Sequence, residues 1–461
     1  MLYGLKLFLK KLLPYSFVLF THKLRAQVAA FYYGFPGKRI KVIGVAGTKG
    51  KTTTTNLVAG ILEEAEFNVA MFSTANMKMA GEESLNTIKL TTPSPFFLQK
   101  FLTEAARKKC DWVVIEVSSH ALKQHRLYGV DFKTVVITNL MPDHLDYHKD
   151  AAEYRDIHLK MIGDKTETVI INGDDKQIPN LKSQIINKSQ ISNPKFSKLI
   201  FLSFGFGEHN DLRCRNIEIS KDETKFRAVF KNSPREIISP LAKFPQSGIS
   251  QGKNLGEFAL KIPGKFNIYN ALAAIAVGLS ADIDPQKIKN ALGKIKSVPG
   301  RMERIFAGEK QEFEVIVDYA HSPDSLKNVY EAVKPYVKNR LIAVLGGTGD
   351  RDKTYRAKAG ALADQFSDIV IVTNEDPYSE DPEDIMEQVI SGIKNKILGK
   401  NLFRILDRKE AIVMAIGLAQ KGDMILITGK GSEQFMVWGE KKIPWDDRKI
   451  VGEALKEKFK K

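Results

Sequence analysis

The sequence predicts an α/β protein, with a doubly wound parallel sheet built around a glycine-rich turn and a second α/β domain after it. Short apolar runs of strand length alternate with stretches of helical periodicity, which is typical of parallel sheets. The alternation occurs twice, with the turn-forming residues Val298-Pro299-Gly300 between the two series. A length of 461 residues also exceeds what one ordinary core accommodates, so two large domains are expected.

In the first series, a strand is expected at 41–46 and a helix over 52–64, where apolar residues return at helical spacing. Polar sequence with several prolines, from about residue 184 to 262, is expected to form loops and β-hairpins appended to this domain. Helical spacing returns at 270–279 and 285–294. Further buried strands are expected at 112–116, 134–139 and 168–172.

The second series has the same alternation. Its apolar runs are rich in Ile and Val, as buried parallel strands are, and they lie at 313–318, 341–346, 369–374 and 424–429. We therefore predict a Rossmann-like α/β C-terminal domain. The expected division is an N-terminal segment of residues 1–39, a central domain of residues 40–298 and a C-terminal domain of residues 299–461.

The N-terminal segment differs in character from both domains. Apolar residues dominate its start, but Lys6, Lys10 and Lys11 interrupt them and Pro14 follows. It is too short and too charged to span a bilayer, which takes about 20 mostly apolar residues, and it lacks the small-residue cleavage site of a signal peptide. Both an amphipathic helix packed on the protein and peripheral membrane contact through residues 1–20 fit this pattern.

Composition indicates a globular protein of a reducing compartment. Cys110 and Cys214 lie far apart and fit neither a disulfide framework nor a metal cluster, so a cytoplasmic location is expected. The formal charge of +16 suits anionic ligands such as nucleotides. Because the lysines are scattered and no RNA-binding motif occurs, nucleic acid is not expected as a partner. We expect a monomer.

The turn after the first strand has the composition of a P-loop. Its glycines let backbone N–H groups curl around phosphate oxygens, and the N-terminus of the next helix adds positive potential. Lys51 would reach the outer phosphates of ATP and the Thr52 hydroxyl would bind Mg²⁺. The strict pattern has glycine where this chain has Val45, but the strand, loop and helix context supports the interpretation. The predicted nucleotide-binding residues here are Gly47, Thr48, Lys49, Gly50, Lys51, Thr52 and Thr53.

Metal ligands are predicted at the ends of the next strands. Glu116 ends an apolar strand, and the carboxyl edge of a parallel sheet would place its side chain beside the phosphates. A buried carboxylate without a metal would be costly there, so we interpret Glu116 as a Mg²⁺ ligand. The stretch from Asn139 to His148 holds two histidines and two aspartates, which a second metal position and a purely structural loop explain equally well.

Together these residues resemble the Mur ligase family, and in particular its MurE-like branch of UDP-N-acetylmuramoyl-peptide synthetases. The resemblance runs from about residue 40 to 450, in the family's order. Besides the P-loop it rests on Glu116-Val117-Ser118-Ser119-His120, Asn139 to His148, Phe266-Asn267, Pro299-Gly300-Arg301-Met302-Glu303, Asp318-Tyr319-Ala320-His321 and Gly429-Lys430-Gly431.

The resemblance implies roles for particular residues. Asn267 would lie near the adenine, Arg301 near the phosphates and Asp318 at the ribose of ATP. The implied catalytic residues are Lys51, Glu116, His144 and His158, and the implied metal ligands are Thr52, Glu116 and His144. The implied substrate-binding residues are Thr91, Thr92, Ser119, Gln124, Arg126, Glu375, Asp376, Tyr378 and Glu433.

The sequence also departs from the family pattern in its first half. The N-terminal domain that grips the uridine is expected to be missing, since 39 residues precede the ATP-binding domain. The nucleotide part of the acceptor would then have no obvious binding domain, or the acceptor would be lipid-linked. His158 stands where the family commonly has a carbamylated lysine that bridges two metals, and Lys160 points elsewhere on a helix. An imidazole is a poor Mg²⁺ ligand, which argues against a second metal here.

Two motifs of the second half depart as well. The diaminopimelate-specific motif Asp-Asn-Pro-Arg reads Glu375-Asp376-Pro377-Tyr378. Arginine would clamp a carboxylate with two hydrogen bonds, whereas tyrosine offers one hydroxyl, so diaminopimelate is not assigned. The motif Gly-Lys-Gly-His-Glu reads Gly429-Lys430-Gly431-Ser432-Glu433, which keeps the glutamate that could bind the incoming amine.

What the resemblance implies is an ATP- and Mg²⁺-dependent amide-bond ligase in peptidoglycan precursor synthesis. It would add an amino acid to a UDP-muramoyl-peptide through an acyl phosphate. Two alternatives stay open: the same chemistry on a folylpolyglutamate-like or lipid-linked acceptor, and a non-catalytic nucleotide-binding protein. Thr91-Thr92-Pro93 and Gln124 to Arg126 argue against the folate-type acceptor, whereas His158 favours the non-catalytic alternative.

Overall fold

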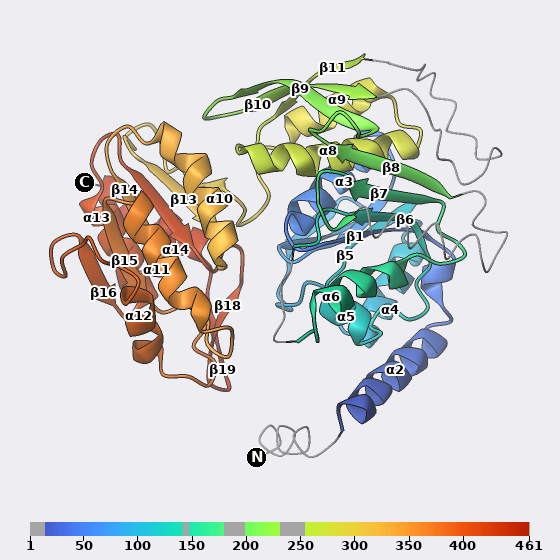
Figure 1. The fold of residues 1–461 in the computed structure, drawn as a ribbon, viewed down its shortest axis with the longest axis horizontal. Coiled ribbons are helices and arrows are strands. Elements are labelled where there is room, and N and C mark those ends of the chain that lie inside the picture. Colours follow the sequence, from blue (N-terminus) through green and yellow to red (C-terminus); the bar gives the residue numbers. More distant parts are fainter. Residues whose placement is uncertain (1–13, 142–146, 179–198, 231–253, 461) are drawn as a thin grey trace.

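Two β-sheets, each with its own layers of helices, organise the chain (Figure 1). The computed structural model describes residues 14–141, 147–178, 199–230 and 254–460. The first sheet and its helices form the central domain, and the second sheet and its helices form the C-terminal domain beside it. The predicted α/β class, with a P-loop domain followed by a Rossmann-like domain, is confirmed.

The sheet of the central domain has eleven strands in the order β11-β10-β9-β8-β7-β6-β1-β5-β2-β3-β4. All neighbours between β9 and β2 in this order pair in parallel. Strands β10 and β11 at one edge, and β3 and β4 at the other, pair antiparallel. Its strands are β1 (Lys41–Ala46), β2 (Val69–Phe72), β3 (Asn76–Met79), β4 (Glu82–Leu85), β5 (Trp112–Glu116), β6 (Phe132–Ile137), β7 (Thr168–Asn172), β8 (Ile200–Gly205), β9 (Leu212–Ile219), β10 (Thr224–Phe230) and β11 (Asn254–Leu260).

Helices cover both faces of this sheet, because its central strands are apolar on both faces. One hydrophobic core joins the sheet to α3 (Lys51–Glu64), α8 (Lys265–Ser280) and α9 (Pro285–Lys294). The core on the opposite face includes α4 (Pro95–Arg107), α5 (Ser119–Lys123), α6 (Ala151–Ile157) and the 3₁₀ turn η2 (His158–Met161).

The region expected to be an appendage belongs instead to this sheet. Strand β8 pairs in parallel with β7, and β9 to β11 continue the sheet from there. Burial alternates along β10, where Phe226 and Ala228 face the core under α8. The polar face of these strands, together with the prolines around them, makes their sequence look like loop, so periodicity alone missed their place in the sheet.

The sheet of the C-terminal domain has six strands in the order β12-β13-β17-β14-β15-β16, parallel except for β12. Helices α10, α11 and α12 pack on one face and α13 and α14 on the other. The sheet strands are β12 (Glu303–Arg304), β13 (Glu314–Asp318), β14 (Leu341–Leu345), β15 (Ile369–Thr373), β16 (Leu402–Ile405) and β17 (Met424–Thr428). The remaining elements are α10 (Pro323–Val333), η4 (Lys334–Tyr336), α11 (Thr354–Phe366), α12 (Pro382–Ile390), α13 (Arg408–Leu418), the hairpin β18 (Phe435–Trp438) and β19 (Lys441–Pro444), and α14 (Asp447–Phe459).

Helix α2 (Tyr15–Tyr32) precedes the central domain, followed by the 3₁₀ turn η1 (Pro36–Lys38). It lies beside α4 at the foot of the domain (Figure 1), and Ala26, Ala29 and Ala30 on its second half are buried. Its other face exposes a row of apolar side chains: Tyr15, Phe17, Phe20, Leu24, Val28, Phe31 and Tyr32. Within the described ranges, no helix has both the length and the apolarity needed to cross a bilayer. Membrane contact through residues 1–20 stays a prediction, as do the domain boundaries near residues 40 and 299.

A buried ion pair fixes the helices of the C-terminal domain. The Arg408 guanidinium donates to both carboxylate oxygens of Asp447, at 2.9 and 2.7 Å, and to the Thr428 carbonyl at 2.7 Å. Both charged side chains are fully buried. They therefore tie the first turns of α13 and α14 to the end of β17.

We predict that Arg408→Met lowers the free energy of unfolding by about 3–5 kcal/mol, because it leaves the Asp447 carboxylate buried without its partner. Urea unfolding followed by circular dichroism measures this loss. Lys449→Met is the matched control, since Lys449 lies 3.9 Å from Glu453 in an exposed pair that contributes at most about 1 kcal/mol. Equal losses in the two variants would contradict the prediction.

Candidate active site

The P-loop connects β1 to α3, at the carboxyl edge of the central sheet. Gly47 and Gly50 have φ angles of 131° and 81°, which favour glycine. A Cβ atom on Gly50 would lie 2.1 Å from the Asn270 side-chain oxygen. The loop therefore needs glycine both for its backbone turn and for the close approach of α8.

Hydrogen bonds within the loop, and one to a residue that follows the neighbouring strand, hold the P-loop in place. The Lys51 ammonium donates to the carbonyls of Gly47 and Thr48, at 2.8 and 2.9 Å. The amide of Lys49 donates to the Asn139 side-chain oxygen at 2.9 Å, and Asn139 follows β6. Thr53 is buried in the first turn of α3. Lys51 thus lies over the turn in which backbone N–H groups would surround a phosphate.

The predicted magnesium ligands lie together beside this loop. The Thr52 hydroxyl donates to Glu116 Oε1 at 3.1 Å, and the Thr74 amide donates to Oε2 at 2.6 Å. A buried carboxylate and a hydroxyl next to a P-loop supply the hard oxygens that Mg²⁺ takes, and phosphate and water would complete its shell. These residues fit the ion. His144, the other predicted ligand, lies outside the described residues, and among those described no cluster of three or more His, Cys, Asp or Glu side chains could hold a metal.

His158 is fully buried and holds a neutral ring. Its Nδ1 bonds the Tyr154 carbonyl at 2.8 Å, and within the described ranges its Nε2 atom has no hydrogen-bond partner. Burial lowers the pKa of His158 to about 4, and the nearby Lys51 ammonium acts in the same direction. A neutral imidazole on the turn η2 cannot supply the negative oxygen of a carbamylated lysine.

Two residues of the C-terminal domain reach the P-loop. The Arg301 guanidinium donates to the Thr52 hydroxyl at 3.0 Å and stacks over the Tyr319 ring, 4.3 Å from its centroid. The Lys49 ammonium donates to the Ser322 hydroxyl at 2.8 Å. Arg301 therefore lies beside the phosphate loop, and its role at the phosphates stays a prediction.

Asp318 and Asn267 are buried, and both are engaged in local hydrogen bonds. Asp318 ends β13 and accepts from the Met302 and Ala320 amides at 2.7 and 2.6 Å, and burial raises its pKa. Asn267 lies on α8 and donates to the Pro263 carbonyl at 2.6 Å. Its side-chain oxygen accepts from Asn270, the residue that contacts Gly50. Their roles at ribose and adenine stay predictions.

The predicted substrate residues of the central domain converge on the loop around Thr92. The Arg126 guanidinium donates to the Thr92 carbonyl at 2.9 Å and to the Gln124 side-chain oxygen at 2.9 and 2.7 Å. The Thr92 hydroxyl donates to the Glu116 carbonyl at 2.9 Å, and Ser119 bonds His148 at 3.0 Å. Gln124 and Arg126 are therefore part of a hydrogen-bond network rather than a solvated surface.

Thr91 links this loop to the metal-site glutamate. Its hydroxyl accepts from the Thr74 hydroxyl at 3.1 Å, and the Thr74 amide is the group that donates to Glu116. The loop that carries Thr91 and Thr92 is therefore fixed relative to the P-loop.

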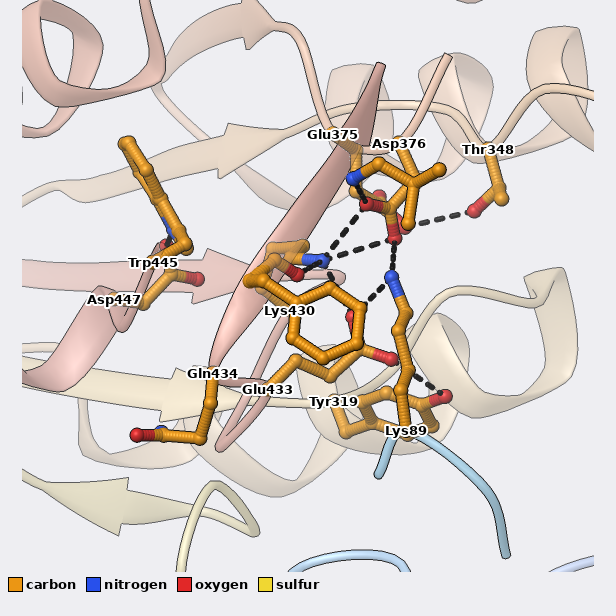
Figure 2. Close-up of polar contacts among 12 residues, drawn as sticks. Lys89, Tyr319, Thr348, Glu375, Asp376, Lys430, Glu433, Gln434, Trp445 and Asp447 are labelled. Atoms are coloured by element: carbon orange, nitrogen blue, oxygen red, sulfur yellow. Dashed lines mark hydrogen bonds and ion pairs between the residues drawn. The ribbon is translucent and has the colours of Figure 1, made fainter. Parts of the chain in front are cut away.

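The predicted substrate residues of the C-terminal domain form an acidic cluster with two lysines (Figure 2). The fully buried Lys430 ammonium donates to both carboxylate oxygens of Asp376, at 3.0 and 2.9 Å, and to Glu433. From the central domain, the Lys89 ammonium lies 2.5 Å from Asp376 Oδ2 and 3.0 Å from Glu433 Oε2. Burial by itself would raise the pKa of Asp376, but the two lysines lower it overall.

Glu375 and Tyr378 border the cluster. Burial raises the pKa of Glu375, whose Oε1 accepts from the Thr348 hydroxyl at 2.8 Å. Burial also raises the pKa of Tyr378 to about 12, so its hydroxyl stays protonated. The Tyr319 hydroxyl lies 3.5 Å from Glu433, which connects the cluster through Tyr319 to Arg301 and the P-loop.

Sequence reasoning missed Lys89. A single lysine in a polar stretch is normally a solvent-exposed residue, and nothing in the spacing predicts a partner 287 positions away. For Lys430 the sequence offers a signal, since a lysine between two glycines follows a buried strand.

Comparison with known proteins gives the following similarities. The family model of the Mur ligase middle domain matches residues 45–278, and that of the Mur ligase glutamate ligase domain matches residues 300–431. The UDP-N-acetylmuramoyl-L-alanyl-D-glutamate--2,6-diaminopimelate ligase of Syntrophomonas wolfei is 37% identical over 444 residues, which cover 95% of this chain and 83% of that protein. A ligase named for the same reaction from Clostridium acetobutylicum is 35% identical, with coverage of 95% and 82%.

Solved structures are similar over most of the chain. A diaminopimelate ligase of the same name is 29% identical with a TM-score of 0.59, and the match covers 91% of this chain and 79% of that one. The folylpolyglutamate synthase of Mycobacterium tuberculosis has a TM-score of 0.68 at 16% identity, with coverage of 88% and 91%, which shows the shared fold alone.

We predict that buried His158 makes stability fall as the solution becomes acidic. The unfolded chain takes up a proton below about pH 6.5, whereas the folded ring does so only near pH 4. Its contribution is therefore complete above pH 6.5 and is lost, by about 3 kcal/mol, as the pH falls to 4. Urea unfolding at several pH values should show this slope in the wild type and a shallower one in His158→Gln. His209→Gln, which alters an exposed ring, should keep the wild-type slope.

Proposed function

Because the chain belongs to the Mur ligase family, we propose that it joins a carboxylate of UDP-N-acetylmuramoyl-L-alanyl-D-glutamate to the amino group of an incoming amino acid. The chain is an ATP-dependent carboxylate–amine ligase, and its curated relatives are named for this acceptor. The observation that carries the proposal is that two half-sites meet: a P-loop in one domain and a buried acidic cluster with an ammonium in the other.

The first half-site suits activation of the acceptor. A carboxylate oxygen of the acceptor would attack the γ-phosphorus of ATP, forming an acyl phosphate as ADP leaves. Lys51 and Arg301 would face the phosphate oxygens on which negative charge grows, and such preorganised cations stabilise a transition state strongly. Both side chains already lie at the loop, through the carbonyls of Gly47 and Thr48 and through the Thr52 hydroxyl.

The second half-site suits delivery of the amine. The nitrogen of the incoming amino acid would attack the acyl carbon, the amide bond would form and inorganic phosphate would leave. Asp376 and Glu433 would hold the amino group before it reacts, since these carboxylates already accept from an ammonium. Closure of the two domains would keep water from the acyl phosphate.

Magnesium would be held by Thr52 and Glu116, and when bound it would neutralise phosphate charge beside Lys51. The neutral His158 adds no carboxylate-like oxygen to this position. We therefore propose one Mg²⁺ site in the described part of the chain. A cytoplasmic monomer that binds no nucleic acid stays our expectation.

The folate-type acceptor is the alternative of the same chemistry. Thr92, Gln124 and Arg126 are linked by hydrogen bonds and border the loop beside Glu116, which supports the muramoyl-peptide proposal. The incoming amino acid is left to experiment, because Tyr378 stands where the resemblance implies an arginine.

The direct test is phosphate release from ATP with UDP-N-acetylmuramoyl-L-alanyl-D-glutamate and a panel that includes meso-diaminopimelate and L-lysine, with products read by mass spectrometry. The expected product is heavier than the acceptor by one amino acid residue and requires both substrates. Phosphate release that is independent of the muramoyl-peptide would overturn the acceptor assignment. Absence of any ATP turnover would overturn the ligase proposal itself.

We predict that Lys51→Met and Glu116→Gln each lower kcat by at least about 100-fold, because Lys51 would face the phosphate oxygens and Glu116 would hold the Mg²⁺ that neutralises them. Circular dichroism should show both variants folded. Lys294→Met, which removes an exposed lysine paired with Glu64, should keep wild-type kcat. A loss below tenfold in the two loop variants would contradict the proposed role.

A further inference from the structure

The Lys89 side chain crosses from the central domain into the acidic cluster of the C-terminal domain (Figure 2). Its ammonium contacts Asp376 and Glu433 at 2.5 and 3.0 Å, and the side chain is 14% exposed. It also lies 5.7 Å from the centroid of the Tyr378 ring and 5.4 Å from that of Phe435. Two carboxylates and two aromatic faces are the groups that recognise a primary ammonium.

We call the site formed by Asp376, Glu433, Lys430 and the rings of Tyr378 and Phe435 the amine seat. All five residues belong to the C-terminal domain. Lys430 balances one of the two carboxylate charges, which leaves one negative charge that Lys89 balances. A group that replaces Lys89 must therefore be a cation, because an unpaired buried carboxylate is strongly unfavourable.

The backbone of Lys89 also indicates a special position. Its φ angle is 57°, in the left-handed region that a lysine rarely adopts. This backbone conformation occurs at the residue whose side chain crosses to the other domain. Two residues later, Thr91 contacts the Thr74 hydroxyl, and Thr74 donates to Glu116. The strained residue thus lies on the same loop that borders the acceptor and metal positions.

We propose that Lys89 is a tethered stand-in for the substrate amine, which holds the two domains together until the incoming amino acid displaces it from the amine seat. This inference rests on the proposed function, in which the amine seat receives the nucleophile. Lys89 is then a positioning residue: it competes with the amino acid and leaves the seat when the amino group enters.

The tethered competitor has a measurable kinetic consequence. If the Lys89 side chain must leave the seat before the amine binds, the apparent KM for the amine is raised. The stronger the preference of Lys89 for the seat, the larger this increase. Lys89→Met keeps the length of the side chain but removes the charge. We expect it to lower the KM for the reactive amino acid, meso-diaminopimelate or L-lysine, at least fivefold, with kcat and the KM for ATP within threefold of wild type.

Controls separate this effect from loss of an ordinary ion pair. Lys89→Arg keeps the charge and should keep a KM within twofold of wild type. Lys78→Met removes a lysine of the same domain whose side chain is 18% exposed and pairs with Glu63 at 2.7 Å, and it should leave all constants unchanged. A raised KM in Lys89→Met, or one within twofold of wild type, would overturn the proposal.

A binding test shows, without turnover, whether the amine seat accepts a primary ammonium. Lys89→Ala opens a space that n-propylammonium, the missing end of the side chain, can fill. We expect 20 mM n-propylammonium chloride to raise the Tm of Lys89→Ala by about 2 °C relative to 20 mM sodium chloride. Wild type, Lys78→Ala and the double variant Lys89→Ala/Asp376→Asn should show no such shift. Equal shifts in all four proteins would overturn the amine seat.

The two tests also separate this inference from the proposed function. If wild type forms no amide bond with any acceptor in the panel, the ligase proposal fails, while the n-propylammonium shift still reports whether a primary ammonium occupies the seat. If wild type is active but Lys89→Met behaves as wild type, the tethered-amine proposal alone fails.

Discussion

The carboxyl edges of two parallel sheets meet in this protein, and the candidate site depends on that geometry. Parallel strands deliver their ends to one edge, where loops and helix N-termini present polar groups. In the central sheet these groups are the P-loop after β1 and Glu116 at the end of β5. In the C-terminal sheet they are Asp318 at the end of β13 and Lys430 after β17. Neither set is a complete site by itself.

Contacts between oppositely charged or polar groups join the two edges. Arg301 reaches Thr52, Lys49 reaches Ser322 and Lys89 reaches Asp376. Each of these three crossings uses a long, flexible side chain, and Phe266 of the central domain adds an apolar contact with the core of the C-terminal domain. Polar interfaces of this kind open more readily than hydrophobic ones, which suits an enzyme that must admit substrates between its domains.

Charge balance also limits what the site can bind. The acidic cluster buries the carboxylates of Asp376 and Glu433, and Lys430 and Lys89 neutralise them at close range. Burial keeps the His158 ring neutral, and the nearby Lys51 ammonium acts in the same direction. A group that takes the place of Lys89 in the cluster must therefore carry a positive charge.

The sequence by itself determined the α/β class, both series of parallel strands and the position of the P-loop, because these follow from apolar runs of strand length and from glycine-rich turns that are local in the chain. It also singled out Glu116 from its position at the end of an apolar strand, and Arg301 through the motif resemblance. Tertiary structure alone decided that strands β8 to β11 extend the central sheet, since their alternating faces gain meaning only from the helix packed above them. It likewise brought Lys89 to Asp376 across 287 positions, a pairing set by the way two domains meet and therefore absent from any local pattern.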